Sequence, residues 1–136
     1  MNRLVPLAAA FAVGLTAGSA LAQTTPPFDI DQAMQVAGKK VFADHCAVCH
    51  APQAGARPIG PSLAGIVGRP AGSLAGFPYS DALKKSGLTW TDDNLRKWIA
   101  DPSQLVPSAL MPHVALADPA ERLYVIEYLK LLKPAK

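Results

Sequence analysis

The sequence predicts one all-α domain with three main helices, further short helices and long loops. Helical signals occur in residues 31–45, 91–100 and 118–132. Between the first two of these segments, residues 51–79 are rich in glycine and proline and contain no convincing strand. A small domain with so much loop holds its shape only when something rigid fills its centre. The chain shows no internal repeat and no sign of a second domain.

The first helix is expected from Asp31, a candidate N-cap, to about His45. One face of this helix is apolar and carries Met34, Ala37, Val41 and Phe42. Gly38 lowers the stability of the helix, so we expect another backbone or ring to approach it closely at that point.

Two helices are expected in the middle of the chain. A short one covers residues 80–85 and is stopped by Gly87. A longer one covers residues 91–100 and is ended by Asp101 and Pro102. Its inward residues are Leu95, Trp98 and Ile99.

The last helix has the clearest start signals. Asp118 is a candidate N-cap, Pro119 suits the first helical position, and Glu121 completes an Asp-x-x-Glu capping box. The expected apolar stripe extends to about residue 132 and comprises Leu123, Tyr124, Ile126, Tyr128 and Leu131.

Cys46 and Cys49 are separated by two residues and followed directly by His50. A Cys-x-x-Cys-His run is typical of covalent haem attachment. The two thiols add across the haem vinyl groups, and the histidine supplies a neutral imidazole nitrogen to the iron. We therefore predict one haem c, attached through Cys46 and Cys49 and ligated by His50.

The alternatives for the cysteines are a disulfide, a redox-active dithiol and a zinc site. A disulfide between them closes a very small loop, and a redox-active dithiol should follow a strand in a βαβ pattern, which the sequence does not show. A zinc site needs more Cys or His ligands at close spacing, and His45 and His113 do not provide that pattern.

The sixth iron ligand decides between electron transfer and ligand binding. Of the three methionines, Met1 belongs to the leader and Met34 to the apolar face of the first helix. Met111 lies in a proline-bounded loop that cannot be helical, so it can fold over a haem face, and we predict it as the second axial ligand. The alternatives are a gap-filling core role for Met111 and ligation by His113.

Residues 1–22 are expected to be a cleaved secretory signal peptide. Arg3 precedes an apolar stretch, and Ala20, Leu21 and Ala22 form a small-x-small cleavage site. The mature domain, residues 23–136, should then reside in the periplasm, where haem is attached to thiols. An uncleaved membrane anchor is the alternative, although polar and helix-breaking residues dilute the apolar stretch.

The charge of the mature chain argues against nucleic acid as a partner. Without Arg3, 12 basic and 10 acidic side chains remain, which gives a net charge of about +2. No basic run interleaved with aromatic residues is present.

Residues 38–128 resemble the class I cytochromes c, in particular the mitochondrial type and the bacterial cytochromes c2. Residues 38–42 resemble the family's first helix, whose glycine and phenylalanine meet an aromatic residue of the last helix, here Tyr128. Residues 60–63 resemble its Gly-Pro-x-Leu loop, which implies that the carbonyl of Pro61 accepts a hydrogen bond from His50.

The resemblance also implies roles around the haem propionates. Arg69 would supply charge there, while Tyr79 and Trp90 would donate hydrogen bonds. Ordinary surface or core positions are the alternatives for these three residues. Trp98 stands where the family usually has a tyrosine near the methionine sulfur, and its indole N–H can donate but not accept. Three positions where many members carry lysines are occupied by Ser103, Gln104 and Leu110.

The function implied is that of a soluble, monomeric periplasmic carrier that moves single electrons between redox complexes and does not span a membrane after cleavage. Two other roles fit a haem motif: an electron-transfer subunit of a periplasmic dehydrogenase or oxidase, and a gas-binding protein with an open sixth position. Catalysis by this chain alone is not indicated, because no triad, phosphate loop or carboxylate pair is visible.

Overall fold

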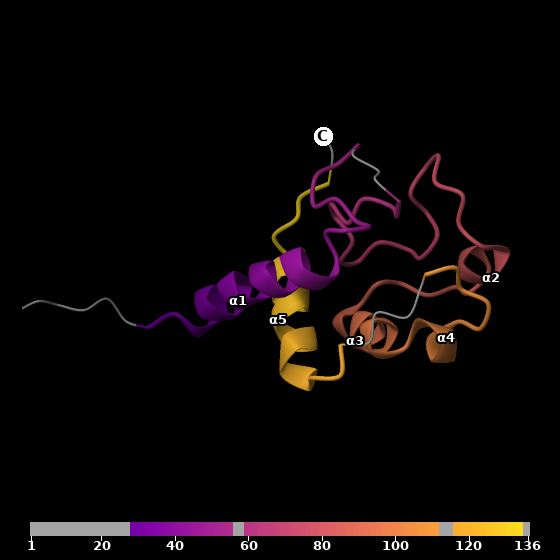
Figure 1. The fold of residues 1–136 in the computed structure, drawn as a ribbon. Helices are drawn as coiled ribbons and strands as arrows, with labels where there is room; N and C mark the ends of the chain where they lie inside the picture. Colours follow the sequence, from indigo (N-terminus) through magenta and orange to yellow (C-terminus); the bar gives the residue numbers. More distant parts are fainter. Residues whose placement is uncertain (1–27, 56–58, 112–115, 135–136) are drawn as a thin grey trace, which may run out of the picture.

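The structure, a computed structural model, describes residues 28–55, 59–111 and 116–134. The predicted signal peptide at residues 1–22, the expected mature start at Gln23 and the candidate ligand His113 lie outside these residues. In the described part, the chain is helical with no strand, and one isolated bridge pairs Pro70 with Thr89. The helices are α1 (Ile30–His45), α2 (Asp81–Lys84), α3 (Asp92–Ala100), α4 (Pro102–Leu105) and α5 (Pro119–Leu129) (Figure 1). The predicted all-α class is confirmed.

The contact between α1 and α5 joins the two ends of the domain (Figure 1). A Cβ atom at Gly38 would lie 1.8 Å from the carbonyl oxygen of Tyr124, so only glycine permits this approach. Beside it, the rings of Phe42 and Tyr128 lie 5.3 Å apart, centroid to centroid. The expected close approach at Gly38 and the implied contact of Phe42 with Tyr128 are both confirmed.

The N-cap of α1 is Asp29. The prediction from the sequence that Asp31 is the N-cap is therefore wrong. The Asp29 carboxylate accepts a hydrogen bond from the backbone N–H of Gln32 at 3.0 Å. Asp31 lies in the first turn, where a negative charge interacts favourably with the helix dipole. The predicted cap Asp118 is correct, since it is the N-cap of α5. Ser80 and Thr91, where two further helices were expected to start, are the N-caps of α2 and α3.

The expected helices do not include α4. Asp101 and Pro102 end α3, as predicted, but they also begin the next helix. The Asp101 carboxylate accepts hydrogen bonds from the backbone N–H groups of Ser103 and Gln104 at 2.9 and 3.2 Å. Pro102 occupies the first turn, where its missing N–H is no loss.

The buried face of α5 differs from the predicted apolar stripe. Its buried residues are Val125, Ile126 and Leu129. Leu123 and Leu131 were predicted to belong to the stripe, and this is wrong, because they are 37% and 45% exposed. Apolar residues surround much of this helix, so their periodicity does not select one face.

Arg122 anchors the segment that leads into α5. Its Nη1 donates hydrogen bonds to the carbonyl oxygens of Leu116 and Ala117. At the end of α5, the ammonium of Lys130 lies 2.8 Å from a carboxylate oxygen of Asp92, the first residue of α3. Within the described ranges, every helix is too short or too polar to cross a membrane.

Replacing Gly38 by alanine should destabilise the domain by about 3 kcal/mol or more, because the new methyl group would overlap the backbone of Tyr124. Chemical denaturation followed by circular dichroism measures this effect. The control is Lys39→Ala at the exposed neighbouring position, which should change the free energy of unfolding by less than about 0.5 kcal/mol. Equal stabilities of Gly38→Ala and the wild type would contradict the close contact.

Candidate functional site

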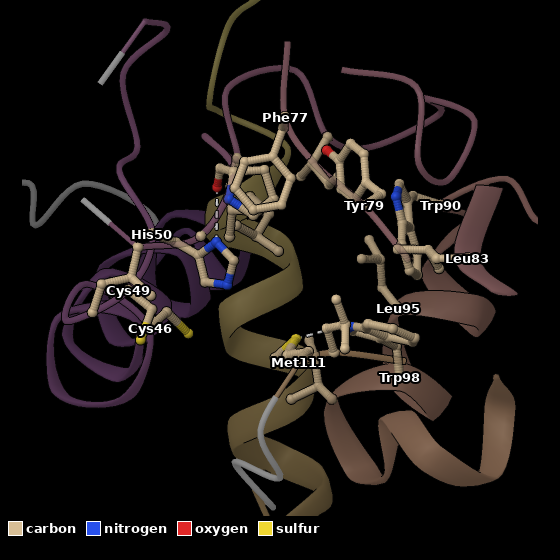
Figure 2. Close-up of a pocket in the computed structure, with 18 of the residues that line it drawn as sticks. Cys46, Cys49, His50, Phe77, Tyr79, Leu83, Trp90, Leu95, Trp98 and Met111 are labelled. Carbon is tan, nitrogen blue, oxygen red and sulfur yellow. Dashed lines mark hydrogen bonds between the residues drawn. The ribbon is translucent and has the colours of Figure 1, made fainter. Parts of the chain in front are cut away.

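A cavity of about 360 Å³ lies between α3, α5 and the loops that follow α1 (Figure 2). Its lining is mainly apolar and, among the described residues, contains no Asp, Glu, Lys or Arg side chain. All of the predicted site residues except Arg69 line it: Cys46, Cys49, His50, Pro61, Tyr79, Trp90, Trp98 and Met111. The fold therefore brings together residues that are up to 65 positions apart in the sequence, from Cys46 to Met111.

The turn after α1 places both cysteines and the histidine on one side of the cavity (Figure 2). The N–H of Cys46 donates to the carbonyl of Phe42 at 2.8 Å, which extends the helical bonding. The N–H of His50 donates in turn to the carbonyl of Cys46 at 2.9 Å. Both thiols are free and line the same cavity as the imidazole ring.

The chemistry of Cys46 is unlike that of a redox-active dithiol. Burial, with a smaller contribution from Cys49, raises the pKa of Cys46 to about 11. Redox-active cysteines have a depressed pKa instead. Among the residues that the structure describes, no group of three or more His, Cys, Asp or Glu side chains could hold a metal ion. The dithiol interpretation thus finds no support in the pKa of Cys46.

His50 is held by a hydrogen bond between its Nδ1 and the carbonyl oxygen of Pro61, at 2.7 Å. A carbonyl can only accept, so Nδ1 carries the proton and Nε2 keeps its lone pair. Burial lowers the pKa of His50, and the bond to Pro61 opposes this shift. Gly60 makes room for the ring, because a Cβ atom there would lie 2.5 Å from Cε1 of His50.

A small hydrogen-bonded frame supports the backbone next to Pro61. Ser62 is buried, and its hydroxyl donates to the carbonyl of Gln53 at 2.6 Å and accepts from the N–H of Ala64 at 3.2 Å. Arg69 donates from Nη1 to the carbonyl of Ala64 at 2.9 Å and from Nη2 to that of Ser62 at 3.2 Å. The guanidinium therefore stabilises the loop that follows Pro61. It also lines a smaller neighbouring cavity.

Tyr79 and Trp90 lie in the upper wall of the cavity in the view of Figure 2. The ring of Tyr79 packs against Phe77 at a centroid distance of 4.8 Å. The ring of Trp90 meets Trp98 edge-on at 5.1 Å. Both side chains are thus aromatic wall residues that also carry a polar hydrogen.

Met111 lies beside Trp98, on the side of the pocket away from the cysteines (Figure 2). The indole Nε1 of Trp98 donates a hydrogen bond to the Met111 sulfur at 2.9 Å. The loop that carries Met111 turns at Ser108, which has a positive φ of 66°. Imidazole and thioether therefore face one cavity from different elements.

The comparisons with known proteins identify the family. The family model for cytochrome c matches residues 35–133. This chain belongs to the cytochrome c family. It is 49% identical over 87 residues to cytochrome c2 iso-2 of Magnetospirillum fulvum, which covers 64% of this chain and 91% of that protein. It is 41% identical over 110 residues to cytochrome c2 of Rhodopila globiformis, covering 81% of this chain and 99% of that protein.

A solved structure agrees with this assignment. Cytochrome cH from Methylobacterium extorquens superimposes with a TM-score of 0.66 at 43% sequence identity, covering 71% of this chain and 96% of that chain. Cytochromes c bind haem c. Cys46 and Cys49 of this cytochrome have the spacing of the haem attachment motif. Cytochromes c are electron carriers and not enzymes, so this cytochrome exchanges electrons with redox partners.

The side chains at the cavity fit a haem. Free thiols, an imidazole cradled by Gly60 and a thioether sulfur meet in an apolar enclosure. The cavity is also lined by residues that the sequence analysis did not single out, namely Ile59, Leu83, Val125 and Leu129. Val125 and Leu129 are one helical turn apart, and that spacing within α5 is the signal that could have revealed them.

Replacing Gly60 by alanine should displace the His50 ring and weaken its bond to Pro61, because the methyl group would lie 2.5 Å from Cε1 and 2.7 Å from Nδ1. We expect a loss of about 1–3 kcal/mol in stability and a shifted Nδ1–H resonance in the NMR spectrum of the reduced protein. Gly68→Ala is the control: Gly68 has a positive φ of 81°, so this variant should lose stability through backbone strain, but no atom lies within 4 Å of its Cβ position and the Nδ1–H resonance should stay unchanged. An unchanged Nδ1–H resonance in Gly60→Ala would contradict the close contact of Gly60 with the His50 ring.

Proposed function

We propose that this cytochrome is a soluble monohaem carrier of the periplasm, which transfers single electrons between redox complexes with its iron ligated by His50 and Met111. The observation that carries the proposal is the meeting of a tautomer-fixed imidazole and a thioether sulfur in one uncharged cavity. The attachment cysteines lie beside the imidazole.

His50 is prepared for ligation by its neighbours. Because Nδ1 donates to Pro61, Nε2 is the nitrogen available to a metal, and the hydrogen bond makes the ring a better electron donor. Burial holds the pKa of His50 below its usual value, which favours the neutral ring that ligation needs. Gly60 leaves space for the ring in this orientation.

Met111 and the apolar walls determine which oxidation state is favoured. When bound, the haem supplies an iron that gains and loses one electron. Thioether ligation and apolar surroundings both favour ferrous iron. If His50 and Met111 both held the iron, no substrate would need to bind or leave, and the chain would only have to keep both side chains in place.

Tyr79 and Trp90 are the proposed hydrogen-bond donors to the haem propionates, since both line the cavity and both carry a polar hydrogen. Arg69 is proposed to supply positive charge. Its nitrogen atoms donate to the carbonyls of Ala64 and Ser62, so contact with a propionate would require Arg69 to exchange one of these bonds.

Met111→Ala should keep its haem, lose the methionine-to-iron charge-transfer band when oxidised, and bind carbon monoxide when reduced. Its midpoint potential should fall by more than about 59 mV, a tenfold change for a one-electron couple. Visible spectra and potentiometric titration test this. Met34→Ala is the matched control, because that methionine lies in α1 and does not line the cavity. A native low-spin thioether spectrum in Met111→Ala would show that another group is the sixth ligand.

The proposed location depends on the signal at residues 1–22. After expression in a bacterium with a cytochrome c maturation system, the periplasmic fraction should contain a chain that begins at Gln23 and carries the mass of one haem. Intact mass spectrometry of both cell fractions tests this. A chain that retains residues 1–22 in the membrane fraction would instead support an uncleaved anchor.

A permanently bound haem subunit is the second candidate, and one observation favours it. Ile59 and Leu110 line the cavity and are nonetheless 73% and 75% exposed, so an apolar surface adjoins the site. Size-exclusion chromatography of the protein from its native cells distinguishes the two roles. Elution as a free monomer supports the shuttle, and stable co-elution with a larger oxidoreductase supports the subunit.

A further inference from the structure

We propose that Ser108 holds the turn before Met111 in a strained backbone conformation, and that this strain makes the loop release the Met111 sulfur more often than a glycine at the same position would. The proposal rests on the proposed ligation by Met111 and concerns how that ligation is regulated. The carrying observation is the positive φ of 66° at Ser108, three residues before Met111. Ser108 is a positioning residue in this scheme, because it acts on the iron only through Met111.

Residues 106–109 form a β-turn. The backbone N–H of Ala109 donates a hydrogen bond to the carbonyl oxygen of Val106 at 3.1 Å, so Pro107 and Ser108 are the two central residues. A proline in the first central position and a positive φ in the second are typical of a type II turn, whose second position favours glycine or asparagine. A serine there is strained, because its Cβ atom lies too close to the following carbonyl oxygen.

No hydrogen bond in the described part of the structure compensates for the strain at Ser108. Its side chain is exposed, and its hydroxyl makes no hydrogen bond to a described residue. Among the described residues, every other position with a positive φ is a glycine, for example Gly87 with a φ of 67°. Glycine adopts this conformation at no steric cost. Ser108 is therefore the exception, and it lies in the loop that carries a candidate iron ligand.

The turn is held in place from both sides. On one side, Val106 is only 5% exposed, and its N–H donates to the carbonyl of Pro102 at 2.9 Å. On the other side, the Met111 sulfur accepts a hydrogen bond from Nε1 of Trp98 at 2.9 Å (Figure 2). A strained conformation persists only while its surroundings enforce it. Since Met111 is the less buried of these two anchors, we infer that Ser108 relaxes when Met111 leaves its place.

Release of the sulfur is therefore coupled to relief of the strain. The strain of a side chain in the left-handed region shifts a local equilibrium by roughly five- to thirtyfold. Glycine would remove this strain, but it would also have more conformational freedom in the open loop, which cancels part of the gain. We therefore expect the open loop to be about three to ten times more populated with Ser108 than with glycine.

Imidazole binding to the oxidised protein measures the population of the open loop, because a ligand that needs the open state binds in proportion to it. Ser108→Gly should bind imidazole about three to ten times more weakly than the wild type. Ser108→Ala keeps the Cβ atom and loses only the hydroxyl, so its affinity should equal that of the wild type. Loss of the methionine-to-iron charge-transfer band during titration with imidazole gives each dissociation constant.

Gly87→Ser is the matched control for strain elsewhere in the chain. It introduces the same side chain at nearly the same φ, no atom lies within 4 Å of the Cβ position, and Gly87 does not line the cavity. This variant should lose stability in chemical denaturation and keep the wild-type affinity for imidazole. Three results would each overturn the proposal: wild-type or tighter binding by Ser108→Gly, binding by Ser108→Ala as weak as that by Ser108→Gly, or tighter binding by Gly87→Ser.

Hydrogen exchange of the oxidised protein measures the same opening without an added ligand. The N–H of Ala109 is protected by its bond to Val106, and an amide exchanges only when such a bond opens. After correction for intrinsic rates, this N–H should exchange about three to ten times more slowly in Ser108→Gly. An unchanged rate overturns the proposal and leaves ligation by Met111 intact. Absence of the charge-transfer band from the wild type would instead overturn the proposed ligation, and the proposal with it.

Discussion

The crossing of α1 and α5 is the contact on which the other parts of the structure depend. Gly38 lets the backbone of Tyr124 come close, and this approach fixes how the two helices lie against each other. The turn that carries the attachment cysteines continues directly from α1, while Val125 and Leu129 on α5 line the cavity. One close backbone contact therefore sets the relative position of two walls of the site.

Hydrogen bonds in and next to the loops between these helices orient the side chains of His50 and Met111. The frame built on Ser62 and Arg69 supports the carbonyl of Pro61, and that carbonyl in turn fixes the tautomer of His50. On the other side, the indole of Trp98 holds the sulfur of Met111. In both places a buried polar group has one partner, so each candidate ligand has one preferred orientation.

Features that depend on neighbouring residues could be predicted from the sequence. The cap at Asp118, the starts of two helices near Ser80 and Thr91, and the need for close approach at Gly38 are all local signals, and the structure agrees with them. The resemblance to class I cytochromes c supplied the pairing of His50 with Pro61 and the nearness of Trp98 to Met111, which no local pattern contains.

Features that depend on distant residues could not be predicted. The buried face of α5 is chosen by what packs on both sides of it, which its own apolar pattern does not reveal. The hydrogen bonds of Arg69 to the carbonyl oxygens of Ala64 and Ser62 could not be predicted either, because the path of that loop is visible only in three dimensions. Asp29 and α4 were missed for a different reason. Asp31, two residues after Asp29, has the same side chain and was predicted as the cap instead, and Asp101 and Pro102 were predicted only to end the preceding helix.

The exposed aliphatic side chains at the mouth of the cavity have a consequence for encounters with other proteins. A partner that docks over Ile59 and Leu110 displaces water from their side chains and releases few counterions there. The ionic strength of the medium would then have little influence on how tightly that part of the surface is held.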